Sequence, residues 1–279
     1  MENLIKGFKE NKAFRITSLL VLLLILITVL APVIAPYNPL EAVMRDANAA
    51  PSAAHLFGTD KLGRDVLSRI LYGASYSLTS VLFLVFLIFV VGTFLGVIAG
   101  YFGGIVDTVI MRFADMMISF PGVILAIAIA GILGGSLVNA MIAMLCVTWT
   151  KYARLSRSMV LKIKKRDFVD AAIVSGGSAP HILWTHILPN ILPLMVITAA
   201  ADIGAMMMEL AGLSSGLPSL GFGSQPPAPE WGLMLNEGRQ QLQTAPWLMI
   251  FPGLAIFITV VVFNLWGDSL RDVLDPRQD

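Results

Sequence analysis

Long runs of apolar residues, separated by short polar segments, are the dominant pattern of this chain. A helix needs about 20 apolar residues to cross a bilayer core of about 30 Å, because each unpaired backbone amide in hydrocarbon costs several kcal/mol. Six stretches approach this length, at residues 16–36, 78–101, 112–133, 137–157, 187–213 and 247–266. The pattern predicts six transmembrane helices and therefore an all-α, polytopic membrane protein.

Two of these stretches depart from a plain span. The fourth is uninterrupted from Leu137 to Thr150, so we expect Lys151 and Arg154 to extend toward the membrane surface at its end. The first is longer than the apolar part of a signal peptide, and Pro32 and Pro36 follow instead of a small-residue cleavage site. It is therefore read as a span that stays in the protein.

Composition agrees with a membrane protein. Charged residues make up 13% of the chain, whereas a soluble domain averages about 25%. The net charge of +1 gives no indication of nucleic-acid binding. The lone Cys146 excludes a disulfide framework and a cysteine-built zinc site.

The distribution of Lys and Arg predicts the orientation. Six spans place both termini on one side, and the side richer in Lys and Arg is cytoplasmic. Fourteen of the 19 basic residues lie on the side of the termini. We therefore expect residues 1–15 and the connection at 158–186 in the cytoplasm. The loops at 37–77 and 214–246 should face outward, the first of them containing a short amphipathic helix.

The connection between the fourth and fifth spans has its own pattern. Asp167 and Asp170 suit the first turn of a short helix, and Gly176-Gly177 would end it. Ser178 can cap a second helix with Pro180 in its first turn. The two helices would form a compact knob that a groove in another protein could hold. Periodicity alone favours a plainer interpretation, a helical hairpin lying on the membrane surface.

The same segment resembles the EAA loop of ABC importer permeases. The matching residues are Asp170-Ala171-Ala172, Gly176, His186 and Ile187-Leu188-Pro189-Asn190, with Asp170 where Glu is usual. Further matches lie at His55 to Arg69, Arg112 to Asp115 with Phe120-Pro121, Pro229 to Gly232, and Gly267 to Pro276. Nearly the whole chain thus resembles the second permease subunit of a dipeptide, oligopeptide or nickel importer. It departs at Ser75, where the family usually has Arg, and in a turn at 213–223 that is four residues longer.

The resemblance implies a fold, a location and a set of partners. It implies a single permease domain over residues 1–279, of the type I ABC importer architecture, in the bacterial cytoplasmic (inner) membrane. The knob would be a coupling helix seated in a cleft of a cytoplasmic ATPase, with two such ATPase subunits as partners. The coupling residues would be Asp170, Ala171, Ala172, Gly176, His186, Leu188 and Pro189. A second, homologous permease would complete the path, and an extracytoplasmic solute-binding protein would dock on the outer loops.

The chain carries no phosphate-binding loop of the form Gly-x-x-x-x-Gly-Lys-Ser/Thr. We therefore expect it to bind no cofactor and to be no enzyme. ATP and Mg would be bound by the partner ATPase subunits.

Two groups of residues within the predicted spans are candidates for packing and transport. Gly92, Gly96 and Gly100 share one helix face and predict close helix packing, within the chain or against a second permease. Asp202 and Glu209 share a face of the fifth span, and a carboxylate at that depth indicates a water-filled cavity. We predict that Asp202, Met206 and Glu209 line the translocation path.

The cargo stays open at this point. The sequence Asp202-Ile203-Gly204 with Met206-Met207 resembles the nickel permeases of the family more than its dipeptide permeases. Asp202 and Glu209 are therefore weak metal-ligand candidates, while nickel, metal chelates and di- or oligopeptides all remain possible cargo.

Two other functions compete with an ATP-driven permease. An ion-gradient-driven secondary transporter or channel could use Asp202 and Glu209 as its ion site. An intramembrane hydrolase could use Ser214, which lies in a Gly-x-Ser-x-Gly pattern at Gly212 to Gly216.

Overall fold

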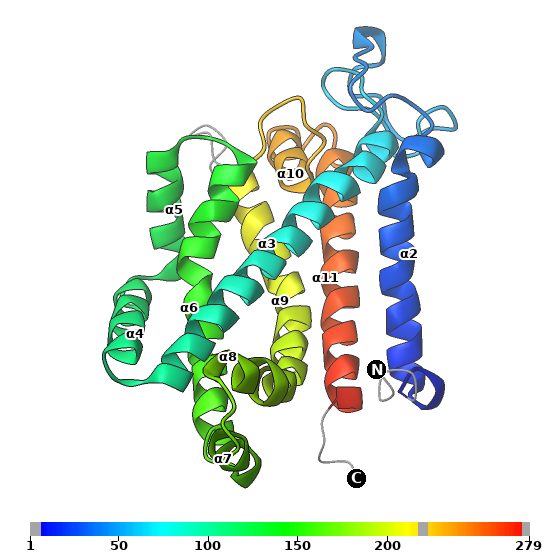
Figure 1. Ribbon diagram of the computed structural model, residues 1–279. Coiled ribbons are helices and arrows are strands. Elements are labelled where there is room, and N and C mark those ends of the chain that lie inside the picture. The colour runs from blue at the N-terminus through cyan, green and yellow to red at the C-terminus, as the bar shows by residue number, and fades with distance from the viewer. Residues whose placement is uncertain (1–6, 217–222, 275–279) are drawn as a thin grey trace.

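The computed structural model describes residues 7–216 and 223–274, and the regular elements within these ranges are all helices (Figure 1). Lys6, Arg277, the end of the C-terminal motif and most of the longer turn at 213–223 lie outside the described residues. The prediction of an all-α membrane protein is confirmed.

Four long helices are apolar enough to cross a membrane: α2 (Lys12–Ile34), α3 (Val66–Phe102), α9 (Leu188–Gly216) and α11 (Trp247–Leu274). A fifth long helix, α6 (Leu137–Ile163), packs along α3 and carries several charged residues in its second half. At 27 residues it is about 40 Å long, which is enough to cross a bilayer.

The predicted third span is broken. Residues 104–133 form α4 (Gly104–Ile118) and α5 (Gly122–Leu133), which meet at an angle of 94°. The break coincides with Phe120-Pro121, because proline lacks a backbone donor and disfavours helical conformation in the residue before it. A continuous helix over 112–133 is therefore excluded.

The prediction of a separate short amphipathic helix within 37–77 is also wrong. Its residues form the first three turns of α3, which continues without a break for 37 residues. Asp65 starts this helix, because its carboxylate accepts a hydrogen bond from the amide of Ser68 at 2.8 Å. The segment before it is loop, apart from one 3-10 turn, η1 (Met44–Asp46).

The two ends of the bundle differ in what they carry. At one end lie α7 (Asp167–Val174) and α8 (Ala179–Ile182), together with the start of α2 and the end of α11 (Figure 1). A π-helical turn, η2 (Leu183–Ile187), joins α8 to α9. The opposite end carries the 37–65 segment and α10 (Trp231–Arg239). We call these the knob end and the network end.

Candidate functional site

The knob consists of α7, α8, the turn between them and the π-helical turn η2 that follows. Gly176 adopts a φ of +81°, a conformation that glycine reaches without strain. Its amide donates to the carbonyl of Ile173 and that of Gly177 donates to Ala172, both at 3.0 Å. These bonds satisfy the last carbonyls of α7 and reverse the chain. The predicted glycine corner is thus present.

The knob buries one apolar side and exposes another. Val169, Ile182 and Ile187 are buried and fix the knob to the bundle. The exposed side carries four large apolar side chains, with Val174 88% and Trp184 72% exposed; the other two are Phe168 and Ile173. A concentration of exposed apolar side chains on one projecting element indicates a contact surface.

The predicted coupling residues lie in and beside this surface. Asp170, Ala171, Gly176 and Pro189 are exposed, whereas Ala172, His186 and Leu188 are partly buried. The side-chain amide of Asn190 donates to the carbonyl of His186 at 2.6 Å, which secures the passage into α9.

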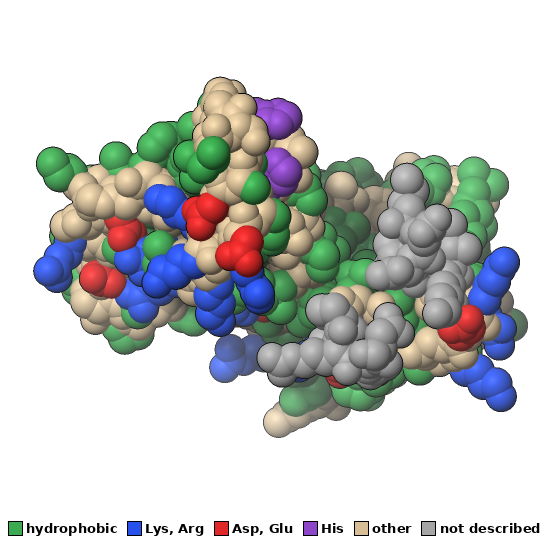
Figure 2. All heavy atoms as spheres, turned by 60° about the horizontal axis from the view of Figure 1, so that its bottom comes forward, with side chains coloured by type: hydrophobic (Ala, Val, Ile, Leu, Met, Phe, Trp, Pro, Cys, Tyr) green, Lys and Arg blue, Asp and Glu red, His purple; other side chains and the backbone are tan. Residues whose placement is uncertain are grey.

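Basic side chains surround the foot of the knob, as Figure 2 shows in blue. Some of them hold helices together. Arg157 bonds Asp107 of α4 at 2.5 Å, and Lys164 donates to the carbonyl of Tyr101 at 2.6 Å. Arg154, expected to extend toward the membrane surface, forms an ion pair with Asp115 at 2.5 Å. Exposed Lys162, Lys165 and Arg166 add positive charge to this face.

A cavity of about 810 Å³ lies between α5, α6 and α9. All three predicted path residues, Asp202, Met206 and Glu209, line it. Most of the remaining wall is apolar or small. It is formed by Gly122, Val123, Ala126 and Ile127 of α5, Met144, Val147, Thr148 and Lys151 of α6, and Ala205, Gly212, Leu213 and Gly216 of α9.

Lys151 binds Asp202 in the wall of this cavity. Its Nζ lies 2.6 Å from Oδ1 and 2.8 Å from Oδ2, and the Tyr152 hydroxyl donates to Oδ2 at 2.9 Å. The expectation that Lys151 extends to the membrane surface is therefore wrong, because a carboxylate on the neighbouring helix attracts it more strongly at this depth. Sequence reasoning missed this pair, although a charge at that depth signals a counter-ion.

The described residues offer no ready site for metal coordination or for serine hydrolysis. In the part of the chain that the structure describes, no three or more His, Cys, Asp or Glu side chains gather in a way that could hold a metal ion. Ser214 is completely buried, and a Cβ on Gly223 would lie 2.1 Å from its Oγ. A substrate cannot reach this hydroxyl, which removes the hydrolase reading.

The three glycines of α3 face α6 within the chain. A Cβ on Gly92 would lie 2.5 Å from the carbonyl of Trp149, and one on Gly96 would lie 2.0 Å from Ser156 Oγ. A Cβ on Gly100 would lie 2.9 Å from that of Val160. The two backbones are in direct contact along this seam, which gains dispersion energy that side chains would prevent.

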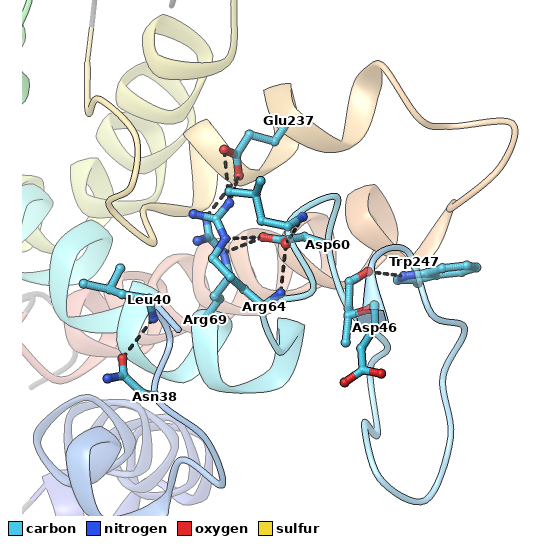
Figure 3. Close-up of polar contacts among 10 residues, drawn as sticks. Asn38, Leu40, Asp46, Asp60, Arg64, Arg69, Glu237 and Trp247 are labelled. Atoms are coloured by element: carbon cyan, nitrogen blue, oxygen red, sulfur yellow. Dashed lines mark hydrogen bonds and ion pairs between the residues drawn. The ribbon is translucent and has the colours of Figure 1, made fainter. Parts of the chain in front are cut away.

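A buried ionic network occupies the network end (Figure 3). Arg64 Nε lies 2.6 Å from Asp60, and Arg69 Nη2 lies 3.0 Å from Glu237 of α10. Both arginines are at most 2% exposed. Asp60 and Arg64 also hold a turn, because the amide of Arg64 donates to the Asp60 carboxylate at 3.0 Å. Glu237, far away in the sequence, was missed.

Comparison with known proteins identifies the family. The family model described as binding-protein-dependent transport system inner membrane component matches residues 92–279. The model described as N-terminal TM domain of oligopeptide transport permease C matches residues 3–51. The two together cover most of the chain.

Individual relatives agree. The dipeptide transport system permease protein DppC of Alkalihalophilus pseudofirmus is 46% identical over 81% of this chain and 73% of its own length. The glutathione transport system permease protein GsiD of Pectobacterium atrosepticum is 44% identical over 82% and 75%. The nickel transport system permease protein NikC of Escherichia coli K12 is 40% identical over 94% of both chains.

A solved structure supports the fold. The chain is similar to one from the inward-facing MetNI methionine ABC transporter, with a TM-score of 0.58 and 19% identity. The match covers 74% of this chain and 97% of the other. With the family models and the relatives, it shows that this chain belongs to the binding-protein-dependent transport system inner membrane components, the permease subunits of ABC importers.

Proposed function

We propose that the chain is one of two permease subunits in an ATP-driven importer of peptides or of nickel, with the knob as its ATPase contact. In this mechanism, closure of two partner ATPases around ATP moves the knob, and the helix bundle opens the path alternately to each side. Such coupling requires that the partner contact the knob differently in the two states.

The exposed apolar surface of the knob is the observation that carries this proposal. Val174 and Trp184 are exposed at the end of the bundle, while buried Val169, Ile182 and Ile187 join the knob to the hydrophobic core. An element that is packed on the core and has an apolar tip can transmit force from a partner that encloses the tip. The absence of a phosphate-binding loop in the sequence assigns the hydrolysis to that partner.

The remaining partners and the location follow from the family and the charge pattern. We infer a second, homologous permease across the path and a solute-binding protein at the network end. We also infer that the chain lies in a bacterial cytoplasmic membrane with its termini in the cytoplasm, because the basic residues concentrate at the knob end.

The test is a charge placed on the knob. Val174→Asp puts a carboxylate on an 88% exposed position, so the free energy of unfolding should change by less than about 0.5 kcal/mol. The ATPases should no longer co-purify, and ATP-dependent uptake into proteoliposomes by the full complex should fall about tenfold or more.

Leu56→Asp is the matched control. Leu56 is 62% exposed at the network end, so its variant carries the same charge on an apolar position away from the knob. It should retain the ATPases. Full ATP-dependent uptake by Val174→Asp would refute the proposed coupling surface. Uptake by the permeases alone, driven by an ion gradient, would support the secondary transporter instead.

A further inference from the structure

Three charged side chains line the cavity between α5, α6 and α9, and two of them neutralise each other. Both carboxylate oxygens of Asp202 bond the ammonium of Lys151, and Oδ2 also accepts from Tyr152. This pair has no net charge, and its carboxylate has little capacity left for a metal ion.

Glu209 differs from Asp202 in its surroundings. It lines the same cavity, is exposed, and makes no hydrogen bond or ion pair with another residue of the described chain. A carboxylate beside mostly apolar walls is costly unless it meets water or a cation. Glu209 therefore gives the cavity wall its net negative charge.

From this arrangement we propose that the cavity passes cargo bearing an ammonium group, such as a short peptide with a free N-terminus, and that Glu209 is the counter-charge for that group. The inference rests on the proposed function and specifies its cargo. A bare metal ion fits less well, because one free carboxylate and the thioether of Met206 do not complete a coordination shell.

The spacing of the charges fits a peptide. Asp202 and Glu209 are seven residues apart, which is about 10 Å along the helix axis. An extended peptide covers about 3.3 to 3.6 Å per residue, so two or three residues span this distance. The Lys151 ammonium has three N–H donors and uses two on Asp202, which leaves one for the carboxylate of the cargo. A zwitterionic peptide would thus meet the Glu209 carboxylate at its ammonium end and the remaining N–H donor of Lys151 at its carboxylate end.

The test compares uptake of two probes by the full complex in proteoliposomes, L-alanyl-L-alanine and its N-acetylated form. Acetylation removes the positive charge and changes little else. In the wild type, ATP-dependent uptake of the free-amine dipeptide should exceed uptake of the acetylated one. In Glu209→Gln, free-amine uptake should fall about tenfold, which corresponds to losing one charge-assisted hydrogen bond, and the ratio of free-amine to acetylated uptake should fall by the same factor relative to the wild type. Any selection by the binding protein is the same in both variants and cancels.

Glu209→Asp is the matched control, because it keeps the charge and should keep the preference. Unchanged free-amine uptake in Glu209→Gln would overturn the proposal, as would an equal loss for both probes, since a merely structural role predicts the latter. Wild-type uptake of NiCl₂ without any uptake of dipeptide would also overturn it. ATP-dependent uptake of neither probe nor of NiCl₂ would reject the proposed function itself, and this inference with it.

Discussion

The network end and the knob end of this molecule treat charge in opposite ways. At the network end, Arg64 and Arg69 are buried and paired with carboxylates from the 37–65 segment and α10. At the knob end, apolar side chains such as Val174 and Trp184 are exposed, and several lysines and arginines lie on the surface around them. One end pairs buried charges with one another, whereas the other combines exposed apolar side chains with exposed basic ones.

This difference indicates that the network end contributes to stability and that the knob end serves as a contact surface. Removing one member of a buried ion pair leaves a buried charge without compensation, so the network end should be sensitive to mutation. Exposed side chains contribute little to folding, so the knob end should tolerate substitution and lose function instead. The Val174→Asp variant described above tests the second half of this contrast.

Arg69→Met should produce the largest effect on stability. Its side chain is 1% exposed and contacts both Glu237 and Asp60, and its loss would leave these carboxylates with less positive charge in a buried site. We expect the free energy of unfolding to fall by about 3 to 5 kcal/mol. Thermal unfolding of the purified protein in detergent measures this.

A double variant sharpens the result. Arg69→Met with Glu237→Leu removes a charge of each sign and should recover part of the lost stability. If the single variant were as stable as the wild type, the network would not be what holds this end together.

Gly96→Ala tests the seam that connects the two ends, with an intermediate effect. The new Cβ would lie 2.0 Å from Ser156 Oγ and 2.1 Å from the carbonyl of Ala153, so α3 and α6 must move apart. Overpacking of this kind costs about 1 to 3 kcal/mol. Unfolding in denaturant or by heat would show it.

The control for this change is Gly212→Ala in α9, where a Cβ would meet nothing within 4 Å. Alanine favours helix over glycine by about 0.8 to 1.0 kcal/mol, so this variant should be slightly more stable than the wild type. Equal effects of the two substitutions would contradict close packing at Gly96.

Glu230→Gln should produce the smallest effect, and one that depends on pH. Glu230 caps α10 outside the membrane-spanning segments, accepting bonds from the amides of Gly232 and Leu233 at 2.8 and 2.9 Å. Burial raises the pKa of Glu230 above its usual 4.5, although these hydrogen bonds oppose the rise. The folded state therefore holds the proton more tightly than the unfolded state.

The sign of the pH dependence follows from this raised pKa. The stability contributed by protonated Glu230 is fully present below the unfolded pKa and is lost as pH rises through the folded pKa. Glutamine cannot ionise, so the wild type should lose stability relative to Glu230→Gln as pH increases from about 4.5. Unfolding temperatures of both proteins across this range check it, and a difference independent of pH would contradict it.

Sequence predicts the helical spans well, but it predicts poorly which side chains of different helices contact one another. A run of about 20 apolar residues is a local signal that needs no tertiary information, which is why the ends of α2 and α9 fall within a few residues of expectation. The helix α11 begins at the expected residue and continues beyond the expected end, to Leu274. The exception is the third span, where Phe120-Pro121 divides an otherwise apolar run. Hydropathy averages over such a break and does not register it.

The cavity residues show the same limit. The shared face of Asp202 and Glu209 follows from their spacing of seven, which is a property of one helix. The pairing of Asp202 with Lys151 joins positions 51 residues apart and depends on how α6 and α9 pack. Glu237 and Arg69 are 168 residues apart. Such contacts are fixed by the tertiary fold, and no local pattern predicts them.

The brevity of α5 has a consequence for assembly. With 12 residues it rises about 18 Å, little more than half of a hydrocarbon core of about 30 Å. The outer face of α5 is apolar, with Ile124 63% and Ile132 86% exposed. Its other face packs against α6 through Ala126 and Ala130. A helix of this length cannot span the hydrocarbon core by itself, and its exposed isoleucines leave an apolar face that lipid or another protein chain can cover.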